Sequence, residues 1–205
     1  MTATQFMALD TVALDGLFEK AHTTNTFVED PVSPAMIQRV YETIRWAPTA
    51  MNIQPLRLTV VDSASARELL VPHLGEANRQ KTLEAPLTLI ASYDPRWHEH
   101  MTHLAPFREG MQEQFEDEED VRHSMGRMNG LIQVGYLLVG LRAHGLQVGP
   151  MNGLDPAGVD SVFHAENGWR TLVAINVGHA PKPDDPTAQR PRAGRLEFAD
   201  AAQIR

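Results

Sequence analysis

The 205-residue sequence contains no cysteine, so disulfide bonds, thiol catalysis and cysteine-based metal sites are excluded. It also has no apolar run approaching the roughly 20 residues that a membrane-spanning helix needs. The first ten residues, MTATQFMALD, lack the basic and apolar regions of a secretory signal peptide. From these absences we expect a cytoplasmic protein that does not interact with membranes.

Positive charge is scarce as well. The chain has 18 Lys and Arg against 26 Asp and Glu, which gives a net charge of −8, and no basic cluster dominates any region. Nucleic acid is therefore not an expected partner. The hydrophobic fraction of 42% is ample for a core, and the length suits a single domain spanning residues 1–205.

Familiar catalytic motifs are missing too. No Gly-x-Gly-x-x-Gly fingerprint, P-loop or Gly-x-Ser-x-Gly elbow occurs. Three histidines, His98, His100 and His103, invite a metal interpretation, but their spacing matches no standard ligand set, and surface or structural histidines are the simpler interpretation. The acidic run at residues 116–120 is typical of a solvated face. We therefore expect no metal site.

The periodicity of apolar residues mixes helices and strands without a strict βαβ alternation, which favours an α+β fold. Residues 94–119 are irregular and are interpreted as an excursion of mostly short helices over the domain. Residues 180–194 contain four prolines and no periodic pattern, so they are interpreted as part of an arm. The expected helices are residues 10–21, 34–46, 63–70, 121–144 and 155–164. The expected strands are residues 56–61, 87–93, 171–178 and a short final one at 196–198, and residues 146–153 are expected to form a short strand followed by a tight loop.

Residues 47–55, which we call the junction segment, connect an expected helix to an expected strand. Pro48 and Pro55 disfavour a continuing helix and stiffen the segment. Between them, Thr49, Asn52 and Gln54 offer neutral donors and acceptors, which suit a polar, planar ligand better than a metal or a bare charge. The alternative is a loop whose polar side chains satisfy only its own backbone.

Three arginines, Arg190, Arg192 and Arg195, lie within six residues of the irregular arm. Guanidinium groups bind anions bidentately, so the cluster could hold a phosphate, which carries about −1.5 to −2 charges at neutral pH. An acidic protein would need such a cluster for that purpose. The alternative is a solvated tail.

Taken together and in order along the chain, several segments resemble the nitroreductase family of flavin enzymes. The residues that carry the resemblance span nearly the whole sequence. Two of the segments, residues 78–81 and 149–153, are most similar to the branch of malonic semialdehyde reductases. The full set is Thr23 and Asn25, the junction segment, Asn78 with Lys81, residues 149–155, and Arg190 with Arg192.

The resemblance implies a central mixed, mainly antiparallel sheet flanked by helices, in an intertwined homodimer that exchanges its C-terminal arms, residues 180–205. It further implies two FMN sites at the subunit interface, with residues 94–119 as a variable excursion over the site. NADH or NADPH would supply hydride in a ping-pong reaction through flavin N5. The small-molecule acceptor would be a small aldehyde such as malonic semialdehyde, giving 3-hydroxypropionate, or a nitro or quinone compound.

The resemblance also suggests roles for individual residues around the FMN, and no side chain is expected to act as a catalytic nucleophile. His22 stands where many family members carry arginine, so either FMN affinity is weaker in this chain or Lys20 and the arm arginines compensate for the missing guanidinium. Two other hypotheses stay open at this stage: a flavin-binding or sensor module without turnover, and a helical dimer without cofactor. The implied contacts are His22, Thr23 and Asn25 at the phosphate and pyrimidine edge; Pro48, Thr49, Ala50, Asn52 and Gln54 at the flavin of the other subunit; Asn78 and Lys81 at the ring and ribityl chain; Pro150, Met151, Asn152 and Gly153 near N5; and Arg190 and Arg192 at the phosphate.

Overall fold

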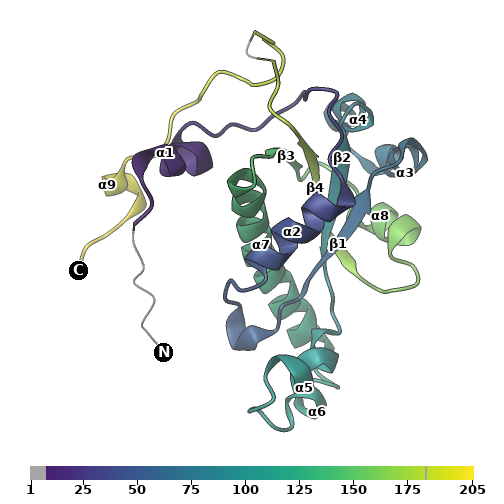
Figure 1. Ribbon diagram of the computed structural model, residues 1–205. Coiled ribbons are helices and arrows are strands. Elements are labelled where there is room, and N and C mark those ends of the chain that lie inside the picture. Colours follow the sequence, from purple (N-terminus) through teal and green to yellow (C-terminus); the bar gives the residue numbers. More distant parts are fainter. Residues whose placement is uncertain (1–7, 183) are drawn as a thin grey trace.

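The computed structural model describes residues 8–182 and 184–205 (Figure 1). Residues 1–7, which contain most of the segment inspected for a signal peptide, and Pro183 of the arm lie outside the described residues. Among the helices that are described, none combines the length and apolar character that crossing a bilayer requires. The helices and short turns are α1 Thr11–Leu14, η1 Asp15–Glu19, α2 Pro34–Ile44, η2 Ala50–Asn52, α3 Ala64–Leu70, η3 Val71–His73, α4 Glu76–Leu83, η4 Trp97–His100, α5 Met101–Leu104, α6 Met111–Gln114, α7 Glu119–Ala143, α8 Pro156–Phe163 and α9 Phe198–Ala201.

Four strands form one sheet in the order β1-β2-β4-β3, and every neighbouring pair is antiparallel. The strands are β1 Leu56–Val61, β2 Leu87–Tyr93, β3 Gln147–Met151 and β4 Arg170–Gly178. β1 and β3 lie at the two edges, and β2 is buried along its whole length. The predicted α+β class, with a mainly antiparallel sheet flanked by helices, is confirmed.

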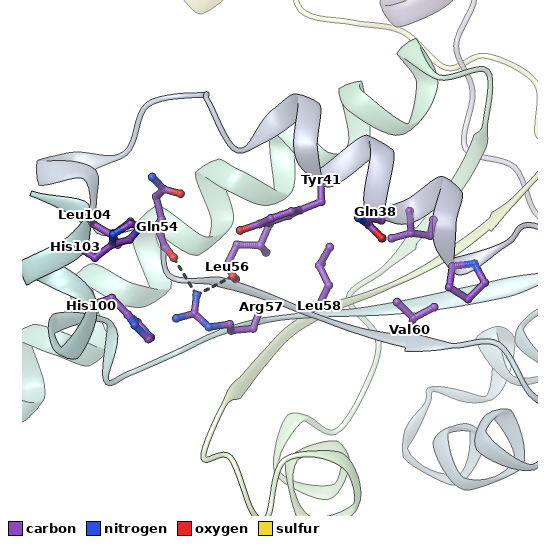
Figure 2. Close-up of a pocket in the computed structure, with 12 residues that line it drawn as sticks. Gln38, Tyr41, Gln54, Leu56, Arg57, Leu58, Val60, His100, His103 and Leu104 are labelled. Atoms are coloured by element: carbon purple, nitrogen blue, oxygen red, sulfur yellow. Dashed lines mark hydrogen bonds between the residues drawn. The ribbon is translucent and has the colours of Figure 1, made fainter.

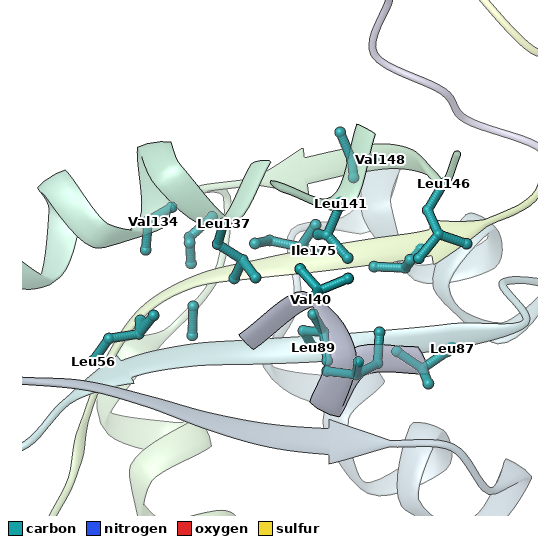
Figure 3. Packing of buried hydrophobic residues seen from close by; sticks show 14 of the residues in the cluster. Val40, Leu56, Leu87, Leu89, Val134, Leu137, Leu141, Leu146, Val148 and Ile175 are labelled. Carbon is teal, nitrogen blue, oxygen red and sulfur yellow. The ribbon is translucent and has the colours of Figure 1, made fainter. Parts of the chain in front are cut away.

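Helices cover both faces of the sheet (Figure 1). On one face, α2 and α7 pack against alternate residues of the strands, and Figure 3 shows Val40, Leu137 and Leu141 meeting Leu89 and Ile175 there. The opposite face is covered by α3 and α8 through a second cluster. Because side chains alternate across a strand, a strand that is apolar at every position must be covered on both sides.

Local sequence signals set the ends of the main helices. Ser33 caps α2 by accepting from the backbone N–H of Met36, and Pro34 occupies the first helical position. Gly145 ends α7 with a left-handed φ of 79°, which glycine adopts without strain. α7 starts at Glu119 rather than Val121, because Glu119 and Asp120 favour the positive end of the helix.

The junction segment is strained. Met51, Asn52 and Gln54 have φ values of 53°, 60° and 38°, in the left-handed region that residues with a Cβ rarely adopt. Each such residue costs on the order of 1–3 kcal/mol, so surrounding contacts must hold it. The backbone N–H of Ala50 donates to Asn129 Oδ1 (2.8 Å), and Asn52 Nδ2 donates to the Leu104 carbonyl (2.7 Å).

The excursion of residues 94–119 consists of short helices, as predicted, and has its own apolar cluster. Trp97 and Met101 are fully buried in it with Ile53 of the junction segment, beside Met111 and Phe115. The excursion therefore packs directly on the junction segment and helps to hold its unusual backbone.

Three expectations about secondary structure need correction. The predicted final strand at residues 196–198 is wrong, because Phe198–Ala201 forms the one-turn helix α9. The predicted helix at 10–21 is shorter and passes from α1 into the π-helical turn η1 at Asp15–Glu19. The predicted helix at 34–46 ends at Ile44.

Helix α4 was not predicted, because its eight residues contain a single leucine and therefore show no apolar periodicity.

Candidate functional site

Residues 21–26 form an extended segment that lies between β3 and the C-terminal arm. On one side, the backbone N–H of Thr24 donates to the Val148 carbonyl (3.0 Å). A Cβ at Gly149 would lie only 2.5 Å from the Thr24 carbonyl oxygen, so the close approach of this segment to β3 requires glycine there. The segment is therefore fixed against the sheet edge.

The arm is held against the other side of the same segment. The backbone N–H of Asn25 donates to the Ala188 carbonyl (2.7 Å), and the Thr26 hydroxyl donates to Asp185 (2.8 Å). Hydrogen bonds from Thr187 and from Thr26 hold the pKa of Asp185 below its ordinary value. Arg192 adds a contact from its guanidinium to the Ala21 carbonyl (3.3 Å). These contacts bring the arm arginines to the polar side chains of residues 22–25.

The result is a cavity of about 700 Å³ lined mainly by cations, which we call the cationic cavity. It contains no carboxylate among its lining residues, although the protein as a whole is acidic. In the described parts of the chain, none of its five Lys and Arg side chains forms an ion pair. Its lining residues are Phe18, Ala21, His22, Thr23, Asn25, Lys81, Arg142, Arg190, Pro191, Arg192, Ala193 and Arg195.

The cations in this cavity are partly desolvated and repel one another. Burial lowers the pKa of Lys81 below its ordinary value of 10.5, and the charge of Arg190 lowers it further. Burial also lowers the pKa of Arg142. A bound anion would relieve both penalties, because it supplies the opposite charge that the cavity lacks.

The structure thus brings together six of the sixteen residues predicted from sequence: His22, Thr23, Asn25, Lys81, Arg190 and Arg192. Arg195 joins them; the sequence had marked it as part of the arm cluster without a role. Phe18 and Arg142 were missed. The available signal for Arg142 was its position three residues before the cap glycine of a long helix, where an arginine side chain reaches past the helix end.

A second predicted group lies next to Lys81, on α4 and the loop after β3. Asn78 Nδ2 donates to the Gly153 carbonyl (3.1 Å), which also accepts from the backbone N–H of Gly75 (2.8 Å). Asn152 is exposed. The loop after β3, which contains Asn152 and Gly153, is therefore held beside α4, and Pro150 precedes it within β3.

Met151 differs from its neighbours in this group. Its side chain is 3% exposed and packs in the apolar cluster beneath α3 and α8. Its sulfur accepts a hydrogen bond from the Thr82 hydroxyl (3.6 Å). The Met151 side chain therefore packs in the core. A contact between Met151 and a ligand would have to use its backbone.

The predicted residues of the junction segment, Pro48, Thr49, Ala50, Asn52 and Gln54, lie elsewhere in the same chain. They contact the middle of α7, where Tyr136 donates to the Pro48 carbonyl (3.2 Å) and Asn129 accepts from Ala50. Along α7, at 1.5 Å per residue, Asn129 lies about 20 Å and Tyr136 about 9 Å from Arg142, and no residue of the junction segment lines the cationic cavity. One chain therefore does not bring the junction segment to its own cationic cavity.

A further cavity of about 550 Å³ lies along β1, beneath α2 and beside α5 (Figure 2). Arg57 lies at its floor and donates to the carbonyls of Gln54 and Leu56, both at 3.0 Å. Its guanidinium also pairs with Asp94 at 2.9 Å, so its charge is already compensated. Apolar side chains of α2 and β1, including Tyr41 and Leu58, line much of the rest of this cavity, which we call the β1 groove. Its polar lining residues besides Arg57 are Gln38, Gln54, His100 and His103.

The three histidines of the excursion do not converge on one point. His98 is buried and lies 3.1 Å from Glu116, whereas His100 faces Asp94 at 3.8 Å. Across residues 8–182 and 184–205, no three His, Asp or Glu side chains are arranged to share a metal ion.

Comparison with known proteins gives the family. Residues 19–179 match the model of the nitroreductase family. The chain belongs to the nitroreductase family. A relative from Leptothrix cholodnii, which carries the provisional name NADH dehydrogenase/NAD(P)H nitroreductase, is 42% identical over 197 residues that cover 96% of this chain and 98% of the relative.

Solved structures show the nitroreductase fold as well. A protein from Exiguobacterium sibiricum, described provisionally as a nitroreductase and solved in complex with FMN, superposes with a TM-score of 0.81 at 16% identity, covering 98% of this chain and 100% of that one. A provisional NAD(P)H:FMN oxidoreductase from Staphylococcus epidermidis gives a TM-score of 0.76 at 17% identity, with coverage of 98% and 100%. These likenesses confirm the predicted nitroreductase-like fold.

Proposed function

We propose that this nitroreductase-family protein is a cytoplasmic, FMN-dependent NAD(P)H oxidoreductase that works as a homodimer. The observation that carries the proposal is the cationic cavity, in which polar and positively charged residues from four distant parts of the sequence meet. A second line of support is the relative from Leptothrix cholodnii, whose name attributes NAD(P)H chemistry to it.

The lining of the cationic cavity fits FMN. The phosphate carries about two negative charges, which suit a cavity rich in guanidinium groups and free of carboxylates. Thr23 and Asn25 add neutral donors and acceptors for the polar edge of a ring. A volume of about 700 Å³ lies in the usual range of 300–1,000 Å³ for small-molecule sites.

Bound FMN would supply the redox chemistry, by taking hydride from NADH or NADPH and passing it to an acceptor. The protein would then need only to bind and orient. We assign Arg190 and Arg192 to the phosphate and Lys81 to the charge of the reduced ring. Asn78 and the loop at residues 150–153 would support the ring side of the site, where their mutual hydrogen bonds keep the loop rigid.

Removing Lys81 should have opposite effects on the stability of the apoprotein and on FMN affinity. Because the folded-state pKa of Lys81 is lowered, its charge costs stability at neutral pH, and the cost fades as pH rises through that pKa. We expect Lys81→Met to raise the melting temperature of the apoprotein by up to about 2–4 °C at pH 7, corresponding to at most about 1 kcal/mol for a partly exposed charge. The same variant should bind FMN more weakly.

Thermal unfolding of the FMN-free protein at pH 7 and pH 10 checks this expectation. The gain should shrink at pH 10, because the folded wild type then carries a smaller fraction of protonated Lys81 than it does at pH 7. Lys182→Met, which removes a charge outside the cationic cavity, is the matched control. A variant less stable than wild type at pH 7 would contradict the mutual repulsion proposed for the cavity.

A homodimer is supported by apolar side chains that one chain leaves exposed. Met128, Leu131 and Ile132 on α7 are 54%, 41% and 43% exposed, and with Gly135 they form a stripe at helical spacing. Exposed apolar patches of this kind mark interaction surfaces. In a dimer that buries this stripe, the nearby junction segment of each chain would reach the cationic cavity of the other.

We also propose that the C-terminal arms are exchanged. The arm leaves the sheet and ends far from it, with Leu196 and Phe198 77% and 70% exposed (Figure 1). The β1 groove has apolar side chains along α2 and β1 and borders an edge strand that pairs only with β2 in the described sheet. An arm from a second copy would cover both, because edge strands and apolar grooves accept extended segments.

For the acceptor we propose a small aldehyde such as malonic semialdehyde, reduced to 3-hydroxypropionate, with nitro and quinone compounds as further acceptors. The aldehyde is supported by the sequence resemblance of residues 78–81 and 149–153. The nitro compounds are supported by the name of the 42% identical relative. The reaction balances as one hydride from NAD(P)H and one proton from solvent added to the carbonyl.

Purified protein tests the proposal in three steps. It should be yellow or take up FMN, lose its yellow colour when NADH or NADPH is added without oxygen, and regain it when an acceptor is added. Malonic semialdehyde, a nitroaromatic and a quinone should be compared as acceptors. Protein that fails to take up FMN would support a cofactor-free dimer, and flavin that NAD(P)H cannot bleach would support a binding module without turnover.

A further inference from the structure

Arg142 lies in the last turn of α7 and lines the cationic cavity, although it was not among the site residues predicted from sequence. One arm of its guanidinium, Nη1, donates to the Leu17 carbonyl (3.0 Å) in the π-helical turn η1. Its Nε is buried and has no hydrogen-bond partner among the described residues. A buried, unpaired guanidinium nitrogen is costly, so a partner for it is expected.

Arg142 also brings a positive charge to a side of the cationic cavity where the neighbouring wall has none. Residues 21–26, which form the wall of the cationic cavity next to η1, contain no Lys or Arg. The arm arginines approach from the opposite side, and Lys81 comes from α4. Among the described residues lining the cavity, Arg142 is the cation that hydrogen-bonds to η1, whereas Arg192 contacts the start of the wall at Ala21.

We propose that Arg142 is a phosphate-binding residue of the FMN site, which anchors η1 through one nitrogen and binds the anion through the others. The inference rests on the proposed FMN function. The fork of the guanidinium allows both contacts at once, because its five N–H groups point in fixed and different directions. A point charge such as Lys could not make both.

A purely structural role is the alternative. In that case Arg142 would serve only to tie η1 to α7 and to complement the negative end of the helix. Arg67 on α3 provides a matched control for this alternative. Its Nη1 also donates to a backbone carbonyl, that of Asp62 (3.3 Å), and its Nε is also buried without a partner among the described residues, but it does not line the cationic cavity.

Titration of the apoprotein with FMN and with riboflavin separates the two roles, because riboflavin is FMN without the phosphate. We expect Arg142→Met to raise the Kd for FMN by about 10- to 100-fold, the range for a hydrogen bond to a charged group. Its Kd for riboflavin should change less than about twofold, since no phosphate contact is lost. Arg67→Met should change neither value. Circular dichroism of each apoprotein confirms folding.

Arg142→Lys is the second variant and covers the case in which Arg142→Met does not fold. It should weaken FMN binding by at least threefold and leave riboflavin binding unchanged, because one point charge replaces a fork. Equal losses for both flavins, or no loss for FMN, would overturn the proposal and leave Arg142 a structural role. Wild-type protein that binds neither flavin would instead refute the proposed function itself, so the two failures are distinguishable.

Discussion

Replacing Arg192 with alanine is expected to weaken FMN binding by about 1.5–3 kcal/mol, the range for a hydrogen bond to a charged group. Arg192 lines the cationic cavity. Its guanidinium donates to the Ala21 carbonyl and so connects the arm to the wall formed by residues 21–26. Alanine would remove the charge and also loosen the arm. Fluorescence quenching of free FMN on titration with apoprotein measures the effect directly.

Arg205→Ala is the appropriate control for this variant. Arg205 belongs to the same arm, is exposed, contacts only Gln203 among the described residues, and does not line the cavity. It should leave the affinity for FMN unchanged. Equal affinities of wild type and Arg192→Ala would contradict the assignment of the arm to the phosphate.

A larger effect is expected when the exposed stripe on α7 is made charged. Leu131→Glu should convert a dimer to monomers, because burying an unpaired carboxylate in an apolar interface costs several kcal/mol. FMN binding should fall with it, by tenfold or more, since no residue of the junction segment lines the cationic cavity of its own chain. Loss of the dimer would thus leave each site incomplete.

Size-exclusion chromatography with light scattering, followed by FMN titration of the same sample, measures both effects. Leu69→Glu serves as the control, because Leu69 is also an exposed leucine on a helix, at 56% exposure, but lies on α3 and outside the stripe. A Leu131→Glu protein that stays dimeric would exclude this face of α7 as the interface. A monomer with unchanged FMN affinity would show that one chain suffices for the site.

The core of the fold could be predicted from sequence because its signals are local. A strand whose composition indicates burial at every position, such as β2, must be covered on both faces. Ser33-Pro34 and Gly145 define helix ends through their own backbone preferences. Helix α4 and the end of the arm escaped prediction for the opposite reason. The apolar residues of α4 and of the arm do not recur at helical spacing. At the end of the arm, the single helical turn α9 stands where Leu196 and Phe198 had indicated a strand.

The site could be predicted only in part. His22, Thr23, Asn25, Lys81, Arg190 and Arg192 were expected together, and the structure places them around one cavity. Their meeting depends on backbone contacts far apart in sequence, such as Asn25 with Ala188, which no local pattern encodes. Arg142 was missed for the same reason, because its role follows from the way the end of α7 packs against η1.

The left-handed backbone of the junction segment also could not be predicted from the sequence. Two prolines indicated a stiff connection, but the strain at Met51, Asn52 and Gln54 depends on Asn129 and the excursion, which hold the segment from outside. Residues under such strain cluster at functional sites, which supports a role for this segment in a site that a second chain completes.

Native mass spectrometry of the purified protein tests the central claim most directly. If cations of one chain and the junction segment of another form each site, the dominant species should have the mass of two chains and two FMN molecules, and single chains should carry no FMN. A dominant single chain that retains FMN, or a dimer that takes up none, would contradict this account.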